Sequence, residues 1–307
     1  MKQLINRTNL IRTGGVLVIY LAVFLLMQVG IIDSYLFLNL VTIGINIILA
    51  VSLNLITGYT GQFSLGHASF MAIGAYTSGI LTARLDLPFI VGVLGAAVMA
   101  ALAGVLIGAP TLRLKGDYLA IATLGFGEIV RIIGLNWEYA GGAMGLNDIP
   151  RYTTWTWLFA LTVLTVVVIS NFIHSRHGRA VISIREDEIA SSSMGVNTSF
   201  YKVLVFSLGA LFAGVAGALY ANYFYFIKPS SFGFMRSIDI LVFVVMGGLG
   251  SIRGSIVSAI ALTLISLSLQ GIPELRMVLY AVILFIMMVY KPQRLLGRFR
   301  TLIKKEA

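Results

Sequence analysis

A series of long apolar stretches constrains this chain more than any other feature of its sequence. A helix that crosses the hydrocarbon core of a bilayer, about 30 Å thick, needs roughly 20 apolar residues. Stretches of this kind recur between residues 14 and 290. With 58% of its 307 residues hydrophobic and only 11% charged, the chain has too little polar surface to cover a water-soluble globule. The sequence therefore predicts an all-α polytopic membrane protein in which residues 1–307 form a single transmembrane domain.

The apolar stretches predict about ten transmembrane helices. They cover residues 14–32, 36–56, 64–83, 89–109, 118–135, 155–173, 201–226, 238–249, 255–271 and 277–290. The stretches 238–249 and 277–290 are shorter than a full crossing, so one pair can be broken or re-entrant and the count can be eight. The first stretch lacks the small-residue cleavage pattern of a signal peptide, and we expect it to be a retained span.

The basic residues predict the orientation of the chain. The net charge is +10, and the basic residues lie at the ends and between the apolar stretches. Without interleaved aromatic residues on one face, this distribution does not indicate nucleic-acid binding. It includes a basic tail over residues 291–307, and the positive-inside rule predicts that both termini are cytoplasmic. The sequence has no cysteine, which excludes disulfides, thiolate metal sites and a cysteine nucleophile.

Polar side chains inside the second stretch share one helical face. Asn39, Thr42, Asn46 and Asn54 fall within an arc of about 120° when successive residues are about 100° apart. A face of this kind either hydrogen-bonds to neighbouring helices or lines a pore.

A polar run broken by glycines follows directly, at residues 57–67. Glycine lets the backbone leave helical geometry, and irregular backbone within a bilayer is tolerated only where it is buried in protein or faces a water-filled cavity. A short cytoplasmic turn is the alternative, and a lone histidine here is more simply structural than a proton carrier. We interpret the run as part of a translocation path. The candidate path residues are Asn46, Asn54, Gly58, Gly61, Gln62, Ser64 and His67.

Two residues of opposite charge lie inside the fifth stretch. Glu128 and Arg131 are three residues apart, so they share one helix face and can neutralise each other. Charges within the membrane are costly and usually face a partner or a cavity. We interpret them as a structural intramembrane ion pair, and the alternative is a contact with the carboxylate or ammonium group of a substrate. Asp239 is expected near the membrane boundary, in contact with water.

The longest charged loop covers residues 174–200. Acidic residues at its front, small residues through its middle and a glycine behind them predict a short helix with a glycine stop. The surface of Ala190, Met194 and Val196 is suited to a groove on another protein, and a plain surface helix is the alternative. The candidate coupling residues are Arg185, Glu186, Asp187, Glu188, Ala190 and Gly195.

Four sequence blocks, in order, resemble a known family. They are NLITGYTGQFSLGHA at 54–68, IREDEIA at 184–190, FAGVAGALYA at 212–221 and GGLGS at 247–251. Over residues 54–292 the chain resembles the branched-chain amino acid permease subunits of binding-protein-dependent ABC importers, the LivM type. In ABC importers a cytoplasmic coupling helix carries an E-A-A motif and a following glycine. Glu188, Ala190 and Gly195 keep the outline of that motif with displaced spacing.

The resemblance implies a multi-pass protein of the bacterial inner (plasma) membrane that translocates branched-chain amino acids. It also implies a second, LivH-like permease, two cytoplasmic ATPase subunits that bind ATP and magnesium, and an external solute-binding protein. Residues 247–254 lack the lysine followed by Ser or Thr that a phosphate loop needs. We therefore expect this chain to bind no nucleotide or other cofactor and to be a transport subunit, not an enzyme.

Two other transport functions remain open. Members of the family also serve urea, short amides and other amino acids. An ion-coupled secondary transporter would use intramembrane carboxylates, and here only Glu128 is deep, with Arg131 beside it.

Overall fold

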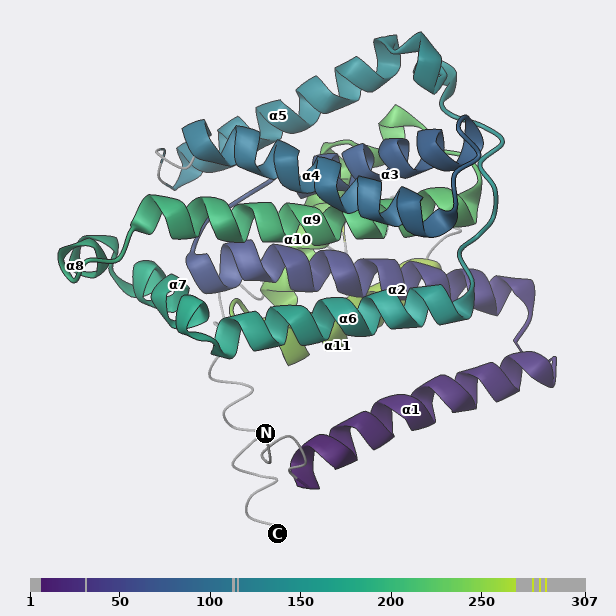
Figure 1. Cartoon of the computed structure of the whole chain (residues 1–307), viewed down its shortest axis with the longest axis horizontal. Coiled ribbons are helices and arrows are strands. Elements are labelled where there is room, and N and C mark those ends of the chain that lie inside the picture. The colour runs from purple at the N-terminus through teal and green to yellow at the C-terminus, as the bar shows by residue number, and fades with distance from the viewer. Residues whose placement is uncertain are drawn as a thin grey trace.

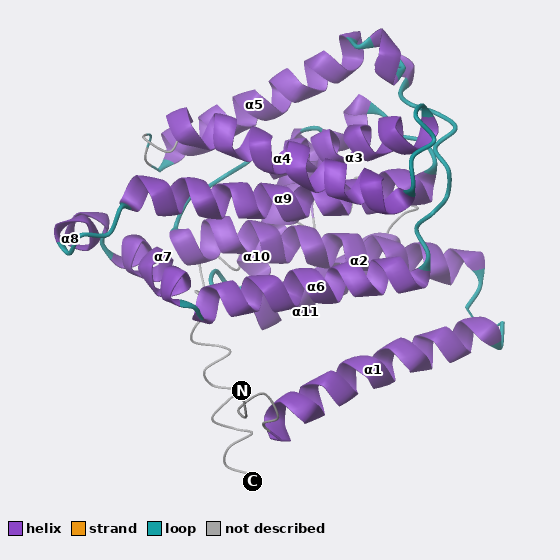
Figure 2. Cartoon of the chain, viewed as in Figure 1, coloured by secondary structure: helices purple, strands orange, loops and turns teal. Residues whose placement is uncertain are grey.

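The computed structural model describes residues 7–30, 32–111, 114, 116–268, 278, 282 and 285. These residues form helices and no strand, as predicted (Figure 2). In chain order the elements are α1 (Arg7–Gln28), α2 (Ser34–Asn54), the π-helical turn η1 (Leu55–Tyr59), α3 (His67–Ala83), α4 (Phe89–Thr111), α5 (Asp117–Asn136), the short 3-10 turns η2 (Glu138–Ala140) and η3 (Gly142–Met144), α6 (Trp155–His174), α7 (Arg176–Glu186), α8 (Glu188–Ser193), α9 (Thr198–Phe224), the 3-10 turn η4 (Pro229–Phe232), α10 (Phe234–Gly247) and α11 (Ile252–Ser268).

Within the described ranges, six helical segments are long and apolar enough to cross a membrane. They are Ser34–Tyr59, Phe89–Thr111, Asp117–Asn136, Trp155–His174, Thr198–Phe224 and Pro229–Gly247, with Ile252–Ser268 as a shorter apolar helix. The chain is therefore a multi-pass membrane protein. The expected count of eight to ten spans is not confirmed.

Individual stretches show why the count differs. The stretch expected to start at residue 64 begins its helix only at His67, because the preceding backbone is irregular. The eighth stretch, expected to be short, is continued backward by η4, so that Pro229–Gly247 is long enough to cross. Most of the stretch 277–290 and the whole tail 291–307 lie outside the described residues, and the cytoplasmic position of both termini stays a prediction.

The two ends of the bundle carry different connections (Figure 1). One end carries α7 and α8 together with η1, and we call it the α7–α8 end. The opposite end carries the links between α5 and α6 and between α9 and α10. These two links are joined by paired backbone hydrogen bonds, from Leu146 N to Ile227 O (3.0 Å) and from Ile227 N to Leu146 O (3.1 Å).

Helix α9 forms the centre of the bundle, between α4 on one side and α2 on the other (Figure 1). Its small residues let neighbouring backbones approach closely. An added Cβ at Gly214 would lie 2.5 Å from the carbonyl oxygen of Ala96, and one at Gly217 would lie 2.0 Å from the carbonyl oxygen of Met71. The close packing of α3, α4 and α9 therefore depends on the absence of side chains at these positions.

The variant Gly217→Ala tests this packing. The added methyl group collides with the backbone of α3 and should destabilise the protein by about 2 kcal/mol, as overpacking of a filled core does. Gly125→Ala in α5 is the matched control, because a Cβ there meets nothing within 4 Å. Alanine also favours a helix over glycine by about 1 kcal/mol, so this control should unfold at or above the wild-type temperature. Thermal unfolding in detergent is the measurement, and equal midpoints for the two variants would contradict the packing account.

Candidate translocation and coupling sites

A cavity of about 620 Å³, which we call the charged cavity, lies among α2, α3, α5, α9, η4 and α10. It is lined by Thr42, Ile45, Met71, Glu128, Arg131, Tyr220, Phe224, Ser230, Ser231, Gly233, Phe234, Met235, Arg236 and Asp239. Because η4 follows the end of α9 that is remote from α7 and α8, this cavity lies toward the opposite end of the bundle. Two guanidinium and two carboxylate groups thus face a space that is otherwise largely apolar.

Glu128 and Arg131 form one wall of the charged cavity. Arg131 Nε donates to Glu128 Oε2 at 2.8 Å, and the side chains of Arg131 and Glu128 are 33% and 36% exposed, respectively. Both belong to α5, whose i and i+3 positions share a face. The structure thus brings the two residues together as a pair, and the pair borders a cavity rather than a packed helix interface.

Arg236 enters the same cavity from the first turn of α10. Its Nη2 donates to Asn46 Oδ1 at 2.8 Å, and Asn46 Nδ2 donates in turn to Thr263 Oγ1 at 2.8 Å. Asn46, a predicted path residue, is buried and does not line the cavity itself. Asn46 instead positions Arg236, which lines the cavity.

Arg236 and Asp239 line the cavity but are not among the predicted path residues. Arg236 precedes the expected stretch 238–249 and Asp239 is its second residue, so the sequence places Arg236 outside the membrane and Asp239 near its boundary. Their spacing of three residues is the same signal that identified Glu128 and Arg131. With η4 continuing the span backward, that signal falls within the membrane segment.

Most of the other predicted path residues lie at the α7–α8 end instead. Ser64 and His67 are buried, and His67 Nε2 lies 2.8 Å from Ser52 Oγ, within hydrogen-bond distance. Asn54 and Gly58 are buried in a hydrogen-bonded cluster, described next. The structure therefore does not bring the seven residues together on one continuous wall.

A polar cluster, which we call the node, joins the end of α2 and η1 to the α10–α11 turn, to α11 and to α7 at the α7–α8 end. Asn54 Oδ1 accepts from Gly250 N at 2.9 Å, and Asn54 Nδ2 donates to Ser255 Oγ at 2.9 Å. Arg185 Nη1 of α7 donates to the carbonyl oxygen of Gly58 at 2.7 Å. The end of α2, the α10–α11 turn and α7 are thereby linked directly.

Gly58 is required by the geometry of the node. A Cβ at this position would lie 1.8 Å from Asn54 Oδ1 and 2.4 Å from Gly250 N, so any side chain would break the contact between them. The irregular backbone that the sequence predicts is thus buried in protein, which is one of the two settings that a bilayer tolerates.

Gly61 and Gln62 border a second, smaller cavity of about 260 Å³ beside the node. Arg185, Glu188 and Lys202 line it as well. Gln62 is buried, and neither atom of its side-chain amide has a hydrogen-bond partner within the described residues. Gly61 has a φ of 74°, so a bulky residue there would strain the backbone. Loss of transport in such a variant would therefore not show that Gly61 lines the translocation path.

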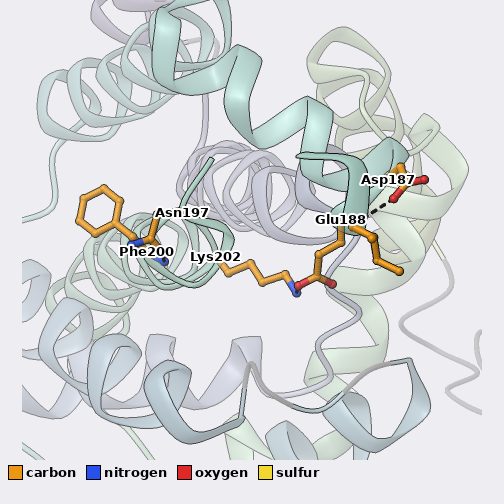
Figure 3. A network of polar contacts seen from close by, with 6 residues as sticks. Asp187, Glu188, Asn197, Phe200 and Lys202 are labelled. Carbon is orange, nitrogen blue, oxygen red and sulfur yellow. Dashed lines mark hydrogen bonds and ion pairs between the residues drawn. The ribbon is translucent and has the colours of Figure 1, made fainter. Parts of the chain in front are cut away.

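Residues 174–200, which we call the coupling segment, form two helices, α7 and α8, before α9 begins, where the sequence predicted one short helix. The break is at Asp187, whose carboxylate caps α8 by accepting from Ile189 N (2.9 Å) and Ala190 N (3.0 Å) (Figure 3). Arg185 and Glu186 therefore end α7 and do not belong to the short helix. Gly195 follows α8 with a φ of 86°, the left-handed geometry expected of a glycine stop.

The charged side chains of this segment are used mostly within the chain. Glu188 of α8 pairs with Lys202 of α9 at 2.5 Å, and Figure 3 shows the lysine reaching across to it. Two apolar side chains of the segment are also strongly exposed, since Ile189 is 75% and Met194 is 85% exposed, beside the 72% exposed side chain of Glu186. Contact with another protein would therefore involve these two residues more directly than Asp187 or Glu188.

A double-mutant cycle on Glu128 and Arg131 tests the structural interpretation of the pair. Glu128→Gln and Arg131→Gln each leave one charge without its partner, and each should destabilise the protein by about 1 kcal/mol, because the pair is about a third exposed. The double variant should cost less than the sum of the two single variants. Thermal unfolding in detergent measures all four proteins. Strictly additive effects, together with lost transport, would favour a substrate contact instead.

Comparison with known proteins identifies the family. The family described as "Branched-chain amino acid transport system / permease component" matches residues 35–288. The high-affinity branched-chain amino acid transport system permease protein LivM of Escherichia coli K12 is 38% identical over 295 residues, which cover 85% of this chain and 69% of that protein. LivM of Salmonella typhimurium is 37% identical over the same shares of the two chains. The permease protein LivH of Escherichia coli K12 is 26% identical over 82% of this chain and 91% of the relative. No solved structure matches this chain. The chain belongs to the family of branched-chain amino acid transport system permease components.

Proposed function

We propose that this chain is a membrane permease subunit of an ATP-binding-cassette importer and that it translocates branched-chain, hydrophobic amino acids delivered by an external solute-binding protein. Family membership supports the permease role, and the names of the LivM and LivH relatives support the substrate class. The chemistry of the charged cavity agrees with that class, because it combines charged groups of both signs with apolar side chains.

The partners follow from the same assignment. This chain is similar to both LivM and LivH relatives, which supports pairing with a second, LivH-like permease in a bacterial inner membrane. The sequence lacks a phosphate loop in residues 247–254, so two partner ATPase subunits would bind ATP with magnesium and hydrolyse it. Their energy must then reach this chain through mechanical contact. With the α7–α8 end in the cytoplasm, as charge predicts, the charged cavity lies toward the external side.

Two contacts within this chain support mechanical coupling to the ATPase subunits. The α7 helix is tied to the membrane helices by the hydrogen bond from Arg185 to the Gly58 carbonyl, and α8 is tied to α9 by the ion pair between Glu188 and Lys202. A displacement of this segment would therefore move the ends of α2 and α9 with it, as packed elements move in shear. We propose that the ATPase subunits contact the exposed face of α8 and that Arg185 passes the displacement to α2.

The double variant Ile189→Ser/Met194→Ser tests the contact with the ATPase subunits. It removes the apolar face of α8 while leaving the Asp187 cap in place, so α8 should still form. The ATPase subunits should co-purify with the variant at about a tenth of the wild-type amount or less, a loss of roughly 1.4 kcal/mol or more. Met144→Ser is the control, because Met144 is 82% exposed at the opposite end of the bundle. Wild-type recovery of the ATPase subunits with the double variant would contradict the assignment of this surface.

Arg185→Met tests the transmission step separately. Methionine keeps an apolar side chain of similar reach but cannot donate to the Gly58 carbonyl, so the ATPase subunits should still bind while uptake per ATP hydrolysed falls about tenfold. Arg179→Met on the same helix is the control, because Arg179 is exposed. Both quantities can be measured in reconstituted vesicles. If Arg185→Met retains full coupling, the node does not carry the signal.

A further inference from the structure

The smaller cavity beside the node, which we call the Gln62 cavity, is bordered by the two residues that tie the coupling segment to the membrane helices, Arg185 and Lys202. We infer that this cavity binds a free aliphatic amino acid from the cytoplasm and that the bound amino acid slows further transport. The inference rests on the proposed function, because the ligand is then the product of import. With the α7–α8 end in the cytoplasm, as charge predicts, the cavity lies on the side where that product accumulates.

The side-chain amide of Gln62 is the clearest sign of a ligand. The residue is only 4% exposed, and neither Nε2 nor Oε1 has a hydrogen-bond partner in the part of the chain that the structure describes. Such a group loses its water without gaining a partner, which is unfavourable. Its backbone nitrogen donates to the carbonyl oxygen of Ile56 at 3.2 Å, so the link from η1 to α3 is held in place. The amide therefore presents one donor group and one acceptor to whatever fills the cavity.

Arg185 supplies a positive charge next to this amide. A Cβ at Gly61 would lie 3.4 Å from Arg185 Cγ, so the arginine packs against the residue that precedes Gln62. Its Nη1 donates to the neutral carbonyl of Gly58, and its Nε lies 3.9 Å from the exposed carboxylate of Glu186, beyond hydrogen-bond distance. A guanidinium has five N–H donors. Most of these donors are thus left for a carboxylate that enters the cavity.

The polar groups together match the two charged groups of an amino acid. A carboxylate would accept from Arg185 and from Gln62 Nε2, and an ammonium group on the same carbon would donate to Gln62 Oε1. Lys202 and Glu188 also border the cavity, but they are paired with each other and are not needed as partners. A simple carboxylic acid would leave Oε1 without a donor, and a simple amine would leave the guanidinium without an anion.

The remaining wall and the size of the cavity suit a small apolar side chain. Phe63, Leu114, Leu119 and Ile184 line it, and the last two are each 4% exposed. Its volume of about 260 Å³ is below the roughly 300–1,000 Å³ of sites for drug-sized ligands. The cavity therefore favours an aliphatic amino acid over a charged or a larger aromatic one.

A ligand in this cavity would hold together elements that the proposed coupling moves apart. Gln62 belongs to the link between η1 and α3, whereas Arg185 belongs to α7. A ligand shifts a conformational equilibrium only by its difference in affinity for the two states. Contacts from two elements to one small molecule form together in only one arrangement of those elements. The bound amino acid should therefore stabilise the resting position of the coupling segment and oppose its displacement.

A single thiol in the cavity wall tests binding. The chain has no cysteine, and Phe63 is 37% exposed, so Phe63→Cys introduces one accessible thiol. The complex is assembled with cysteine-free partner subunits in lipid nanodiscs, without the solute-binding protein, and the rate of reaction with a maleimide is measured. Leucine should slow this reaction. Isocaproate, which lacks the ammonium group, and isoamylamine, which lacks the carboxylate, should each need at least about tenfold higher concentrations for equal protection (roughly 1.4 kcal/mol).

Gln62→Met on the same background tests the role of the amide. Methionine is of similar size but has no amide, so protection should need at least about tenfold more leucine (roughly 1.4 kcal/mol). Gln28→Met is the matched control, because Gln28 is exposed in α1, and it should leave protection unchanged. The variant also removes an unpartnered buried amide, so it should unfold at or above the wild-type temperature. If Gln62→Met does not assemble, the comparison of the three ligands decides the site.

Uptake by the complete importer tests the effect on transport. Vesicles with the cytoplasmic side inside are loaded with ATP, with or without leucine, and the initial rate of labelled leucine uptake is recorded. The ratio of the two rates is compared within each protein. Leucine inside should lower the wild-type rate several-fold and should have a clearly smaller effect on Gln62→Met. An equal effect in both proteins overturns the regulation.

The binding outcomes are separate from the proposed function. The site is overturned if leucine gives no protection, if all three ligands protect equally, or if Gln62→Met is protected as wild type is, because water alone would then fill the cavity. It is also overturned if the thiol reacts only after the ATPase subunits are removed, because those subunits would then occupy the cavity. Absence of leucine uptake by the wild-type importer rejects the proposed function, whereas normal uptake without protection rejects the site alone.

Discussion

The structure depends on how the backbone at the end of α2 finds its hydrogen-bond partners. A bilayer offers none, so irregular backbone near it must be satisfied by protein. Here the side chain of Asn54 bonds to the α10–α11 turn and to α11, and the side chain of Arg185 bonds to the Gly58 carbonyl. The requirement for buried partners thus fixes α2, α10, α11 and α7 to one another at one end of the bundle.

The same helices carry the charged cavity nearer their other ends. Helix α2 supplies Ile45 to the cavity and Asn54 to the node, nine residues or about 14 Å apart along a helix. Helix α10 supplies Arg236 to the cavity and continues into the turn that contains Gly250, while α9 supplies Lys202 to α8 and Tyr220 to the cavity. Three helices therefore connect the coupling segment with the cavity, and a rigid-body displacement at one end would change the shape of the other.

The sequence predicted the class of fold and several local features for clear physical reasons. Apolar stretches predicted membrane helices, and Gly195 predicted the end of α8. The three-residue spacing of Glu128 and Arg131 placed them on one face. What it could not predict depends on contacts between distant segments. The side chain of Arg185 turns inward to Gly58, and Asn46 supports Arg236 across 190 residues of sequence. Hydrophobic periodicity carries no signal for such pairings, so the path residues were grouped by their order along the chain instead of their position in space.

If the coupling segment and the charged cavity change together, the accessibility of the cavity measures this most directly. The chain has no cysteine, so Met235→Cys introduces a single thiol into the cavity wall. In a complex with cysteine-free partner subunits, its rate of reaction with a membrane-impermeant maleimide is compared with and without ATP trapped by vanadate. The account predicts a several-fold change in rate upon trapping, and predicts that Arg185→Met abolishes this change while trapping still occurs. An equal change in rate upon trapping in the proteins with Arg185 and with Arg185→Met would contradict this coupling.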